Sequence, residues 1–222
     1  MTRSCFVTGT DTGVGKTLVA TALLHALARQ HPRVIGMKPV AAGALWVDGH
    51  WANEDTLALR AASTVTVAPE LDNPILLHAP VSPHIAARRE GRRIDLDHVV
   101  ACYHALASQA DAVVVEGAGG FHVPLSDDLT GADLAVALDL PLVLVVGLRL
   151  GCLNHALLTA EAIRHRGLHI AGWVANRTDP GMLAPEDNLA WLQHRLGAPL
   201  LADIAHQSPP EPKALAAHFV LP

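Results

Sequence analysis

Two hydrophobic patterns alternate along the chain. Short, continuous apolar runs, such as 142–146, are typical of strands that are covered on both faces. Longer segments carry apolar residues every three or four positions, which is typical of helices with one buried face. Because the two kinds of segment follow one another, we predict an α/β fold with a doubly wound, mostly parallel sheet and helices on both faces.

The predicted elements cover most of the chain. Apolar runs predict strands at 5–7, 34–40, 113–115, 142–146, 170–175 and 199–204. Helical periodicity predicts a first helix that ends at His31-Pro32. It predicts further helices at 57–62, 96–106, 185–197 and 214–217. Two more helices are predicted by one end only: one begins near residue 85, and another ends at residue 166. An Asp-Gly turn predicts a loop or hairpin at 46–51, and four prolines predict an irregular excursion over 69–83 that covers the site.

The first helix directly follows a glycine-rich stretch. Gly-Thr-Asp-Thr-Gly-Val-Gly-Lys-Thr at 9–17 comes after the first apolar run, and the helix then shows a polar stripe of Thr21, His25 and Arg29. Backbone N–H groups of such a loop favour phosphate, with Lys16 on the β- and γ-phosphates and Thr17 on Mg²⁺. A glycine-rich turn with an incidental lysine is the alternative, since Thr10 replaces the usual first glycine. The strand–loop–helix context favours nucleotide binding of the P-loop NTPase type.

Three charged residues lie next to predicted strands or helices where ligands bind in open α/β sheets. Lys38 ends a strand, beside the phosphates or simply in solvent. Asp55 precedes a predicted helix, as an N-cap or first-turn charge or as a Mg²⁺ ligand. Glu116 follows a buried strand and needs a partner, either Mg²⁺ shared with Thr17 or a salt bridge. Asn176, after a later strand, suits an adenine edge or a turn.

Composition restricts the function classes. The chain has 222 residues, half of them hydrophobic, and no linker divides it, so we predict one domain over 1–222. A net charge of −5 argues against nucleic acid as a partner. The apolar region 134–153 contains charges and a proline, so we predict a helix and a buried strand there and no membrane span.

Cysteine and histidine patterns predict no metal centre of their own. Cys5, Cys102 and Cys152 are widely separated, which indicates free thiols in a reducing, cytoplasmic compartment. Fourteen histidines show no spacing that favours a histidine-based metal site. The first strand begins within a few residues of Met1, which leaves no room for a signal peptide.

Seven motifs in this order make the chain resemble the dethiobiotin synthetase family over roughly residues 6–204. They are Val-Thr-Gly-Thr-Asp-Thr at 7–12, Val-Gly-Lys-Thr at 14–17, Lys-Pro-Val at 38–40, Ser-Pro-His at 82–84, Val-Glu-Gly-Ala-Gly-Gly at 115–120, Leu-Gly-Cys-Leu-Asn-His at 150–155 and Gly-Trp-Val-Ala-Asn at 172–176. The resemblance implies that 7,8-diaminopelargonate, CO₂ (or bicarbonate) and Mg-ATP give dethiobiotin, ADP and phosphate. It further implies a carbamate, then a carbamic–phosphoric anhydride, in a cytoplasmic homodimer of the biotin pathway.

The resemblance also implies site residues, matched position by position. The implied catalytic residues are Lys38, Lys16 and Thr12. The implied metal ligands are Thr17, Asp55 and Glu116. The nucleotide falls to Gly13, Val14, Gly15, Lys16, Thr17, Asp55, Glu116, Gly117, Ala118, Gly119, Asn176 and Arg177. The substrate falls to Lys38 and Ala42, and its carboxylate to Gly151, Cys152, Leu153 and Asn154 at a helix N-terminus across the dimer interface.

The chain departs from the family pattern at three places, and two alternatives remain. Gly13 stands where some members have glutamate, Ala42 where serine or threonine is common, and Ile-Ala-His at 204–206 where some have Ile-Pro-Trp. One alternative is another P-loop amidoligase, whose large substrates would call for an added domain. The other is a partner-switching ATPase of the partitioning type. Those proteins have a signature lysine at the position that Asp11 occupies in this chain.

Overall fold

The computed structural model describes residues 4–221. Its centre is a six-stranded sheet in the order β10-β9-β8-β1-β7-β2, in which all neighbours are parallel. Buried, apolar sequences form these strands because both faces of the sheet are covered. Their bounds are β1 Cys5–Gly9, β2 Val34–Met37, β7 Ala112–Glu116, β8 Leu142–Gly147, β9 Ile170–Asn176 and β10 Leu200–Ile204. The predicted doubly wound α/β fold is confirmed.

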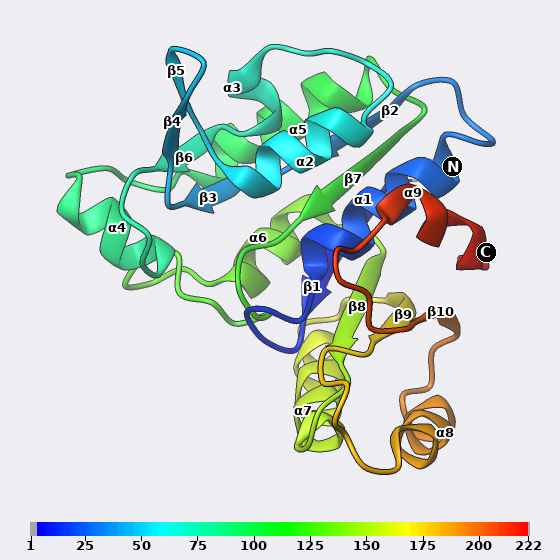
Figure 1. Ribbon diagram of the computed structural model, residues 1–222. Helices are drawn as coiled ribbons and strands as arrows, with labels where there is room; N and C mark the ends of the chain where they lie inside the picture. The colour runs from blue at the N-terminus through cyan, green and yellow to red at the C-terminus, as the bar shows by residue number, and fades with distance from the viewer. Residues whose placement is uncertain (1–3, 222) are drawn as a thin grey trace.

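Helices cover both faces of this sheet (Figure 1). Alternate residues of one strand enter two different cores: Val113 and Val115 pack in one, Ala112 and Val114 in the other. The first core lies under α4 Pro83–Arg89, α5 Leu96–Ala107, α6 Gly131–Leu138, α7 Cys152–His165 and α8 Pro185–Arg195. The second lies under α1 Lys16–Leu27, α2 Glu54–Ala62 and α9 Pro212–Leu215, which is followed by a 3₁₀ turn at Ala216–His218.

The predicted polar stripe of α1 is wrong at Thr21. Its side chain is 4% exposed, and its hydroxyl donates to the carbonyl of Thr17 at 2.7 Å. Figure 1 shows why: α9 lies directly beside α1, and α2 flanks the same helix. A third layer, which periodicity alone does not reveal, therefore buries α1 almost all round.

The predicted strand 34–40 is wrong in its second half. Pro39 interrupts it, and β3 Val40–Ala42 turns away to pair in parallel with β6 Ile75–Leu77 in a separate small sheet. Proline lacks the N–H that a continuing ladder would need. The region 69–83, predicted as irregular, thus contains β6 and the short helix α3 Pro69–Asp72.

The predicted turn at 48–49 does form a hairpin. Strands β4 Leu45–Val47 and β5 His50–Ala52 pair antiparallel, with Trp46 opposite Trp51. In Figure 1 the hairpin projects beyond the central sheet, next to α3 and β6. Among residues 4–221, no helix combines the length and the apolar character needed to cross a membrane.

Candidate active site

The predicted site residues gather where the parallel strands end. The loop after β1 leads into Lys16 and Thr17, Glu116 is the last residue of β7, and Lys38 follows β2. Since β2, β7 and β1 are neighbours, their carboxyl ends bring these side chains to one edge of the sheet. The α/β topology therefore builds the site from segments about 100 residues apart in sequence.

The phosphate loop is fixed by a glycine and an asparagine. Gly15 has a φ of +89°, and a Cβ atom there would lie 2.2 Å from Nδ2 of Asn176. That amide nitrogen donates to the carbonyl of Val14 at 2.8 Å. Asn176, at the end of β9, therefore holds the loop in shape, and only glycine allows so close an approach.

Four side chains form a compact, charged cluster behind the loop. The Thr17 hydroxyl lies 2.7 Å from Oδ1 of Asp55 and 2.9 Å from Oε1 of Glu116. The ammonium group of Lys38 lies 2.8 Å from Oδ2 of Asp55 and 2.6 Å from the same Oε1 of Glu116. The structure thus brings all four predicted residues together, and Lys38 is the partner that Glu116 requires.

One oxygen of this cluster lacks a partner. Oε2 of Glu116 is buried and makes no hydrogen bond with any residue from 4 to 221. An unpaired buried carboxylate oxygen is costly, which points to a further cation or donor at this position. A hydroxyl and two carboxylates are hard oxygen ligands, and Mg²⁺ commonly takes one or two carboxylates and completes its shell with phosphate and water. The residues Thr17, Asp55 and Glu116 therefore fit Mg²⁺.

The cluster shifts the proton affinity of its members in opposite directions. Burial is the largest influence on Lys38 and lowers its pKa, but Glu116 and Asp55 together outweigh it, so the pKa is raised and the ammonium is retained. For Asp55, burial likewise opposes the net effect, and Lys38 holds its pKa below the usual value. Burial dominates at Glu116 and raises its pKa.

The pKa of Lys16, unlike that of Lys38, is lowered. The residue is only 7% exposed, and its Nζ donates to the carbonyl of Asp11 at 3.1 Å. Burial, with repulsion from Lys38, lowers the pKa of Lys16 to about 8. A buried ammonium with one neutral partner is suited to an arriving anion such as a phosphate.

Two residues that the sequence did not assign support the loop. The carboxylate of Asp11 accepts the N–H of Thr12 at 2.7 Å and pairs with the guanidinium of Arg149 at 2.6 Å. Arg149 comes from the loop after β8, so the pair links the phosphate loop to the segment that starts α7. A basic residue following a strand was the only sequence signal for it.

Asn53 is a third residue that the sequence did not assign. It caps α2 by accepting the N–H groups of Asp55 and Thr56, at 3.0 and 3.4 Å. Its Nδ2 donates to the carbonyl of Ala42 at 3.2 Å. It therefore joins the end of β3 to the helix that carries Asp55. Asparagine is a common N-cap residue, but a link to Ala42 leaves no local pattern in the sequence.

The remaining predicted residues lie around this cluster. Gly117 follows Glu116 and presents its carbonyl 3.5 Å from the ammonium of Lys38. Gly151 caps α7 with a φ of +95°, and Cys152, Leu153 and Asn154 form the first turn, one strand away from the phosphate loop. Arg177 is committed elsewhere: it makes two bonds to Asp203, at 2.9 and 2.6 Å, and one to Glu186 at 2.6 Å.

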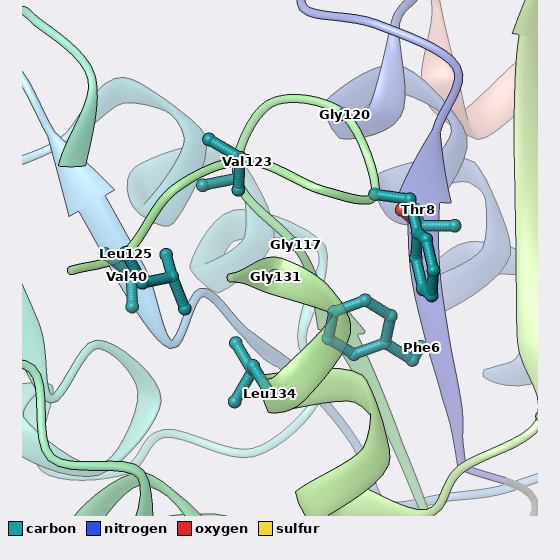
Figure 2. Close-up of a pocket in the computed structure, with 11 residues that line it drawn as sticks. Phe6, Thr8, Val40, Gly117, Gly120, Val123, Leu125, Gly131 and Leu134 are labelled. Carbon is teal, nitrogen blue, oxygen red and sulfur yellow. The ribbon is translucent and has the colours of Figure 1, made fainter. Parts of the chain in front are cut away.

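A small cavity lies under the glycine-rich loop after β7 (Figure 2). Figure 2 shows the rings and side chains of Phe6, Leu134 and Val40 around it, with Thr8 above Phe6. Its volume is about 10 Å³, at the lower limit for one water molecule. Apolar packing therefore supports the loop from below, so Gly117, Ala118 and Gly120 rest on a nearly filled core.

Comparison with known proteins identifies a close relative. A family profile described as AAA domain matches residues 3–213. The curated protein "ATP-dependent dethiobiotin synthetase BioD" of Aromatoleum aromaticum is 53% identical over 220 residues, which cover 99% of this chain and 98% of the relative.

Solved structures show a similar fold at low sequence identity. The septum site-determining protein MinD of Pyrococcus horikoshii, complexed with Mg-ADP, has a TM-score of 0.59 at 19% identity, over 94% of this chain and 83% of its own. A ParA family ATPase of Chlorobium tepidum has a TM-score of 0.57 at 18% identity, over 98% and 90%. At these identities the likeness concerns the fold alone.

Proposed function

Because the chain belongs to the ATP-dependent dethiobiotin synthetase family, we propose a course of reaction for it that uses the cluster around Lys38. As a member of this family the chain is an ATP-dependent ligase that makes dethiobiotin in biotin biosynthesis. The proposed substrates are 7,8-diaminopelargonate, CO₂ (or bicarbonate) and Mg-ATP. All 222 residues are proposed to form one synthetase domain, of which residues 1–3 and 222 lie outside the described structure.

In the proposed reaction, one amine of the substrate adds to CO₂ and forms a carbamate. A carbamate oxygen then attacks the γ-phosphorus, ADP leaves, and a carbamic–phosphoric anhydride results. The second amine attacks the carbonyl carbon, phosphate leaves with the bridging oxygen, and the ureido ring closes. Two anions meet in the phosphoryl transfer, so positioning and charge neutralisation supply most of the catalysis.

Two lysines supply the positive charge. Lys16, buried at the phosphate loop, is proposed to bind the β- and γ-phosphates. Lys38, held by Asp55 and Glu116, is proposed to contact the carbamate and the γ-phosphate together. This convergence of Lys38 with two carboxylates and Thr17 is the observation that carries the proposal. Thr12, on the exposed side of the loop, is proposed to contact the transferred group.

Mg²⁺ is proposed to bind Thr17, Asp55 and Glu116. When bound, it neutralises phosphate charge and polarises the phosphoryl group. The unpartnered Oε2 of Glu116 supports this assignment. Asn176 is proposed to read adenine through its side-chain oxygen, because its nitrogen already donates to Val14. Arg177, paired with two carboxylates, is proposed to shape the wall of the base site.

The other end of the substrate is proposed to lie at α7, between two copies of the chain. Gly151 to Asn154 form the N-terminal turn of this 14-residue helix, where the dipole and N–H groups favour a carboxylate. Leu150, just before the helix, is 95% exposed, and Leu158 on it is 56% exposed. These two large exposed leucines, one just before α7 and one on it, support a homodimer that covers them. Ala42, at the end of β3, is proposed to line the diamine end.

Product formation tests the proposal. The purified protein is incubated with 7,8-diaminopelargonate, ¹³C-bicarbonate and Mg-ATP, and mass spectrometry is combined with an assay of phosphate release. We expect dethiobiotin carrying one ¹³C only when all three substrates are present, in step with phosphate. Phosphate release without dethiobiotin would reject the substrate and favour another P-loop activity.

A further inference from the structure

A partly buried ion pair lies outside the proposed site, between α2 and α3. Nε of Arg60 donates to Oδ2 of Asp72 at 2.7 Å, and Nη2 donates to Oδ1 at 2.6 Å. Asp72 is 2% exposed, so its carboxylate is shielded from water, while the Arg60 side chain is 26% exposed. A two-bond contact between a guanidinium and a carboxylate fixes both groups in one plane and one orientation. The pair therefore locks α2 and α3 at a defined separation.

The same segment of α3 holds the backbone of Lys38. The N–H of Lys38 donates to the carbonyl of Asp72 at 2.8 Å. The carbonyl of Lys38 accepts from Nδ2 of Asn73 at 2.7 Å, and Asn73 is also buried. Lys38 lies between β2 and β3 and belongs to neither strand. These two bonds from consecutive residues take the place of the sheet bonds that would otherwise fix it.

Helix α2 is connected to both the side chain and the backbone of Lys38. It carries Asp55 and Arg60 five residues apart, or about 7.5 Å along the helix axis. Asp55 accepts a hydrogen bond from the ammonium of Lys38 at 2.8 Å. Arg60 donates to the carboxylate of Asp72, and the carbonyl of Asp72 accepts the backbone N–H of Lys38. Both ends of Lys38 are thus fixed to α2, one directly and the other through α3. A change in the Arg60–Asp72 distance changes where the Lys38 ammonium lies relative to Asp55.

We propose that Arg60 and Asp72 are positioning residues that set the distance between the Lys38 ammonium and the carboxylates of the proposed metal site. The inference rests on the proposed function, since it concerns the same lysine and carboxylates. It goes beyond it by assigning a role to a pair that touches no substrate. Removing Arg60 leaves the buried carboxylate of Asp72 without its counter-charge, in the residue whose carbonyl binds the Lys38 N–H, and we expect α3 to shift.

The test compares Arg60→Met with the wild type in two measurements. Titration with Mn²⁺ in the presence of ATP, followed by electron paramagnetic resonance, reports the metal site without any turnover. Steady-state kinetics report kcat and the KM for ATP. Supporting partners of a metal site are commonly worth about 10- to 100-fold. We expect kcat to fall and the Mn²⁺ affinity to change, each by a factor within that range, with the KM for ATP changed less than about twofold.

Two further variants separate positioning from mere stability. Arg33→Met breaks another arginine–aspartate pair, the more exposed contact of 2.8 Å with Asp111 at the opposite end of β2 and β7, and we expect it to lower only thermal stability. Arg60→Lys, which keeps the charge but not the two-bond geometry, should recover part of the Mn²⁺ affinity and kcat. If Arg60→Met fails to fold, Asp72→Asn, which keeps the shape and the backbone carbonyl, gives the deciding comparison.

The outcomes distinguish this inference from the proposed function. A folded Arg60→Met protein (or Asp72→Asn in its place) with Mn²⁺ affinity and kcat within about twofold of wild type overturns the positioning role. Equal losses in Arg33→Met overturn it too, because the effect would then be general destabilisation. If the wild type makes no dethiobiotin, the proposed function fails, but the Mn²⁺ titration still decides the inference.

Discussion

Lys38 and the proposed metal ion depend on the same oxygens. Its ammonium lies 2.6 Å from Glu116 and 2.8 Å from Asp55, and both carboxylates are also proposed metal ligands. A cation bound there would compete with Lys38 for the carboxylates. In the proposed reaction, Lys38 would then be freer to contact the γ-phosphate and the carbamate. At the residue scale, the proposal is therefore an exchange of partners among a few charges.

Replacing Lys38 separates its two roles. We expect Lys38→Met to lower kcat about 10²- to 10³-fold, the range for loss of one preorganised charged donor. We also expect it to bind Mn²⁺ more tightly than wild type in the absence of nucleotide, because the carboxylates lose their competing cation. Isothermal titration and steady-state kinetics check both, with the exposed Lys213→Met as control. Near-normal turnover would remove Lys38 from the reaction.

Lys16 makes nucleotide binding depend on pH. Its pKa is lowered to about 8 from an ordinary 10.5, so the unliganded protein loses this proton as the pH rises through about 8. Bound phosphate favours the charged ammonium and raises the pKa again. ATP binding should therefore take up a proton increasingly between about pH 7 and about pH 9.

Calorimetry in buffers of different ionisation enthalpy measures this uptake, with chelator present to exclude metal. The expected heat difference between buffers grows with pH over that window. A difference that stays constant with pH would show that Lys16 is already charged in the free protein.

The sequence predicted these residues better than it predicted their contacts. Position at the ends of strands singled out Lys38 and Glu116, and both do lie at the site. The same reasoning left open whether Glu116 pairs with a metal or a lysine, because that depends on side-chain distances. Arg60 and Asp72 gave no signal, since a salt bridge between distant segments leaves no local pattern.

Among the elements, α6 carries a capping box whose carboxylate is sensitive to acid. Burial, the largest single influence, raises the pKa of Asp133, but hydrogen bonds from Thr130 and Arg166 outweigh it and lower the pKa to about 2. An acid with a lowered pKa in the folded state stabilises the fold above its ordinary value, here 3.8. That contribution is lost as the pH falls from about 4 to about 2.

Asp133→Asn should remove this acid sensitivity. We expect a loss of about 1 kcal/mol in the free energy of unfolding near neutral pH, as for a lost cap, and a smaller loss near pH 2. Urea unfolding at several pH values gives both figures. Asp97→Asn, an exposed first-turn change in α5, is the control. Equal destabilisation of Asp133→Asn at every pH would contradict the assignment.

Elements were predicted well where the pattern was local. The buried strand 142–146 and the hairpin at 46–51 formed as expected, because apolar runs and an Asp-Gly turn act within a few residues. The strand at 34–40 was overextended, although Pro39 was a visible break. The burial of Thr21 was missed because α2 and α9, the latter almost 200 residues later in the chain, pack beside α1.

At the scale of the whole molecule, the proposed homodimer depends on the exposed Leu150. If a second copy covers Leu150, then Leu150→Asp should shift the sedimenting species toward the monomer and raise the KM for the diamine about tenfold or more, the scale of an interface hot spot. Leu183, 88% exposed in the segment before α8, offers a matched control in Leu183→Asp. Unchanged mass for Leu150→Asp would place the interface elsewhere.

The whole molecule is proposed to move one oxygen atom from CO₂ to phosphate. In the proposed course, a carbamate oxygen attacks the γ-phosphorus and later leaves with the phosphate when the ring closes. The measurement is a brief reaction with ¹⁸O-labelled CO₂, followed by mass spectrometry of the released phosphate. One ¹⁸O per phosphate, in step with dethiobiotin, is the expected result. Phosphate whose new oxygen comes from water instead would contradict phosphorylation of a carbamate at this site.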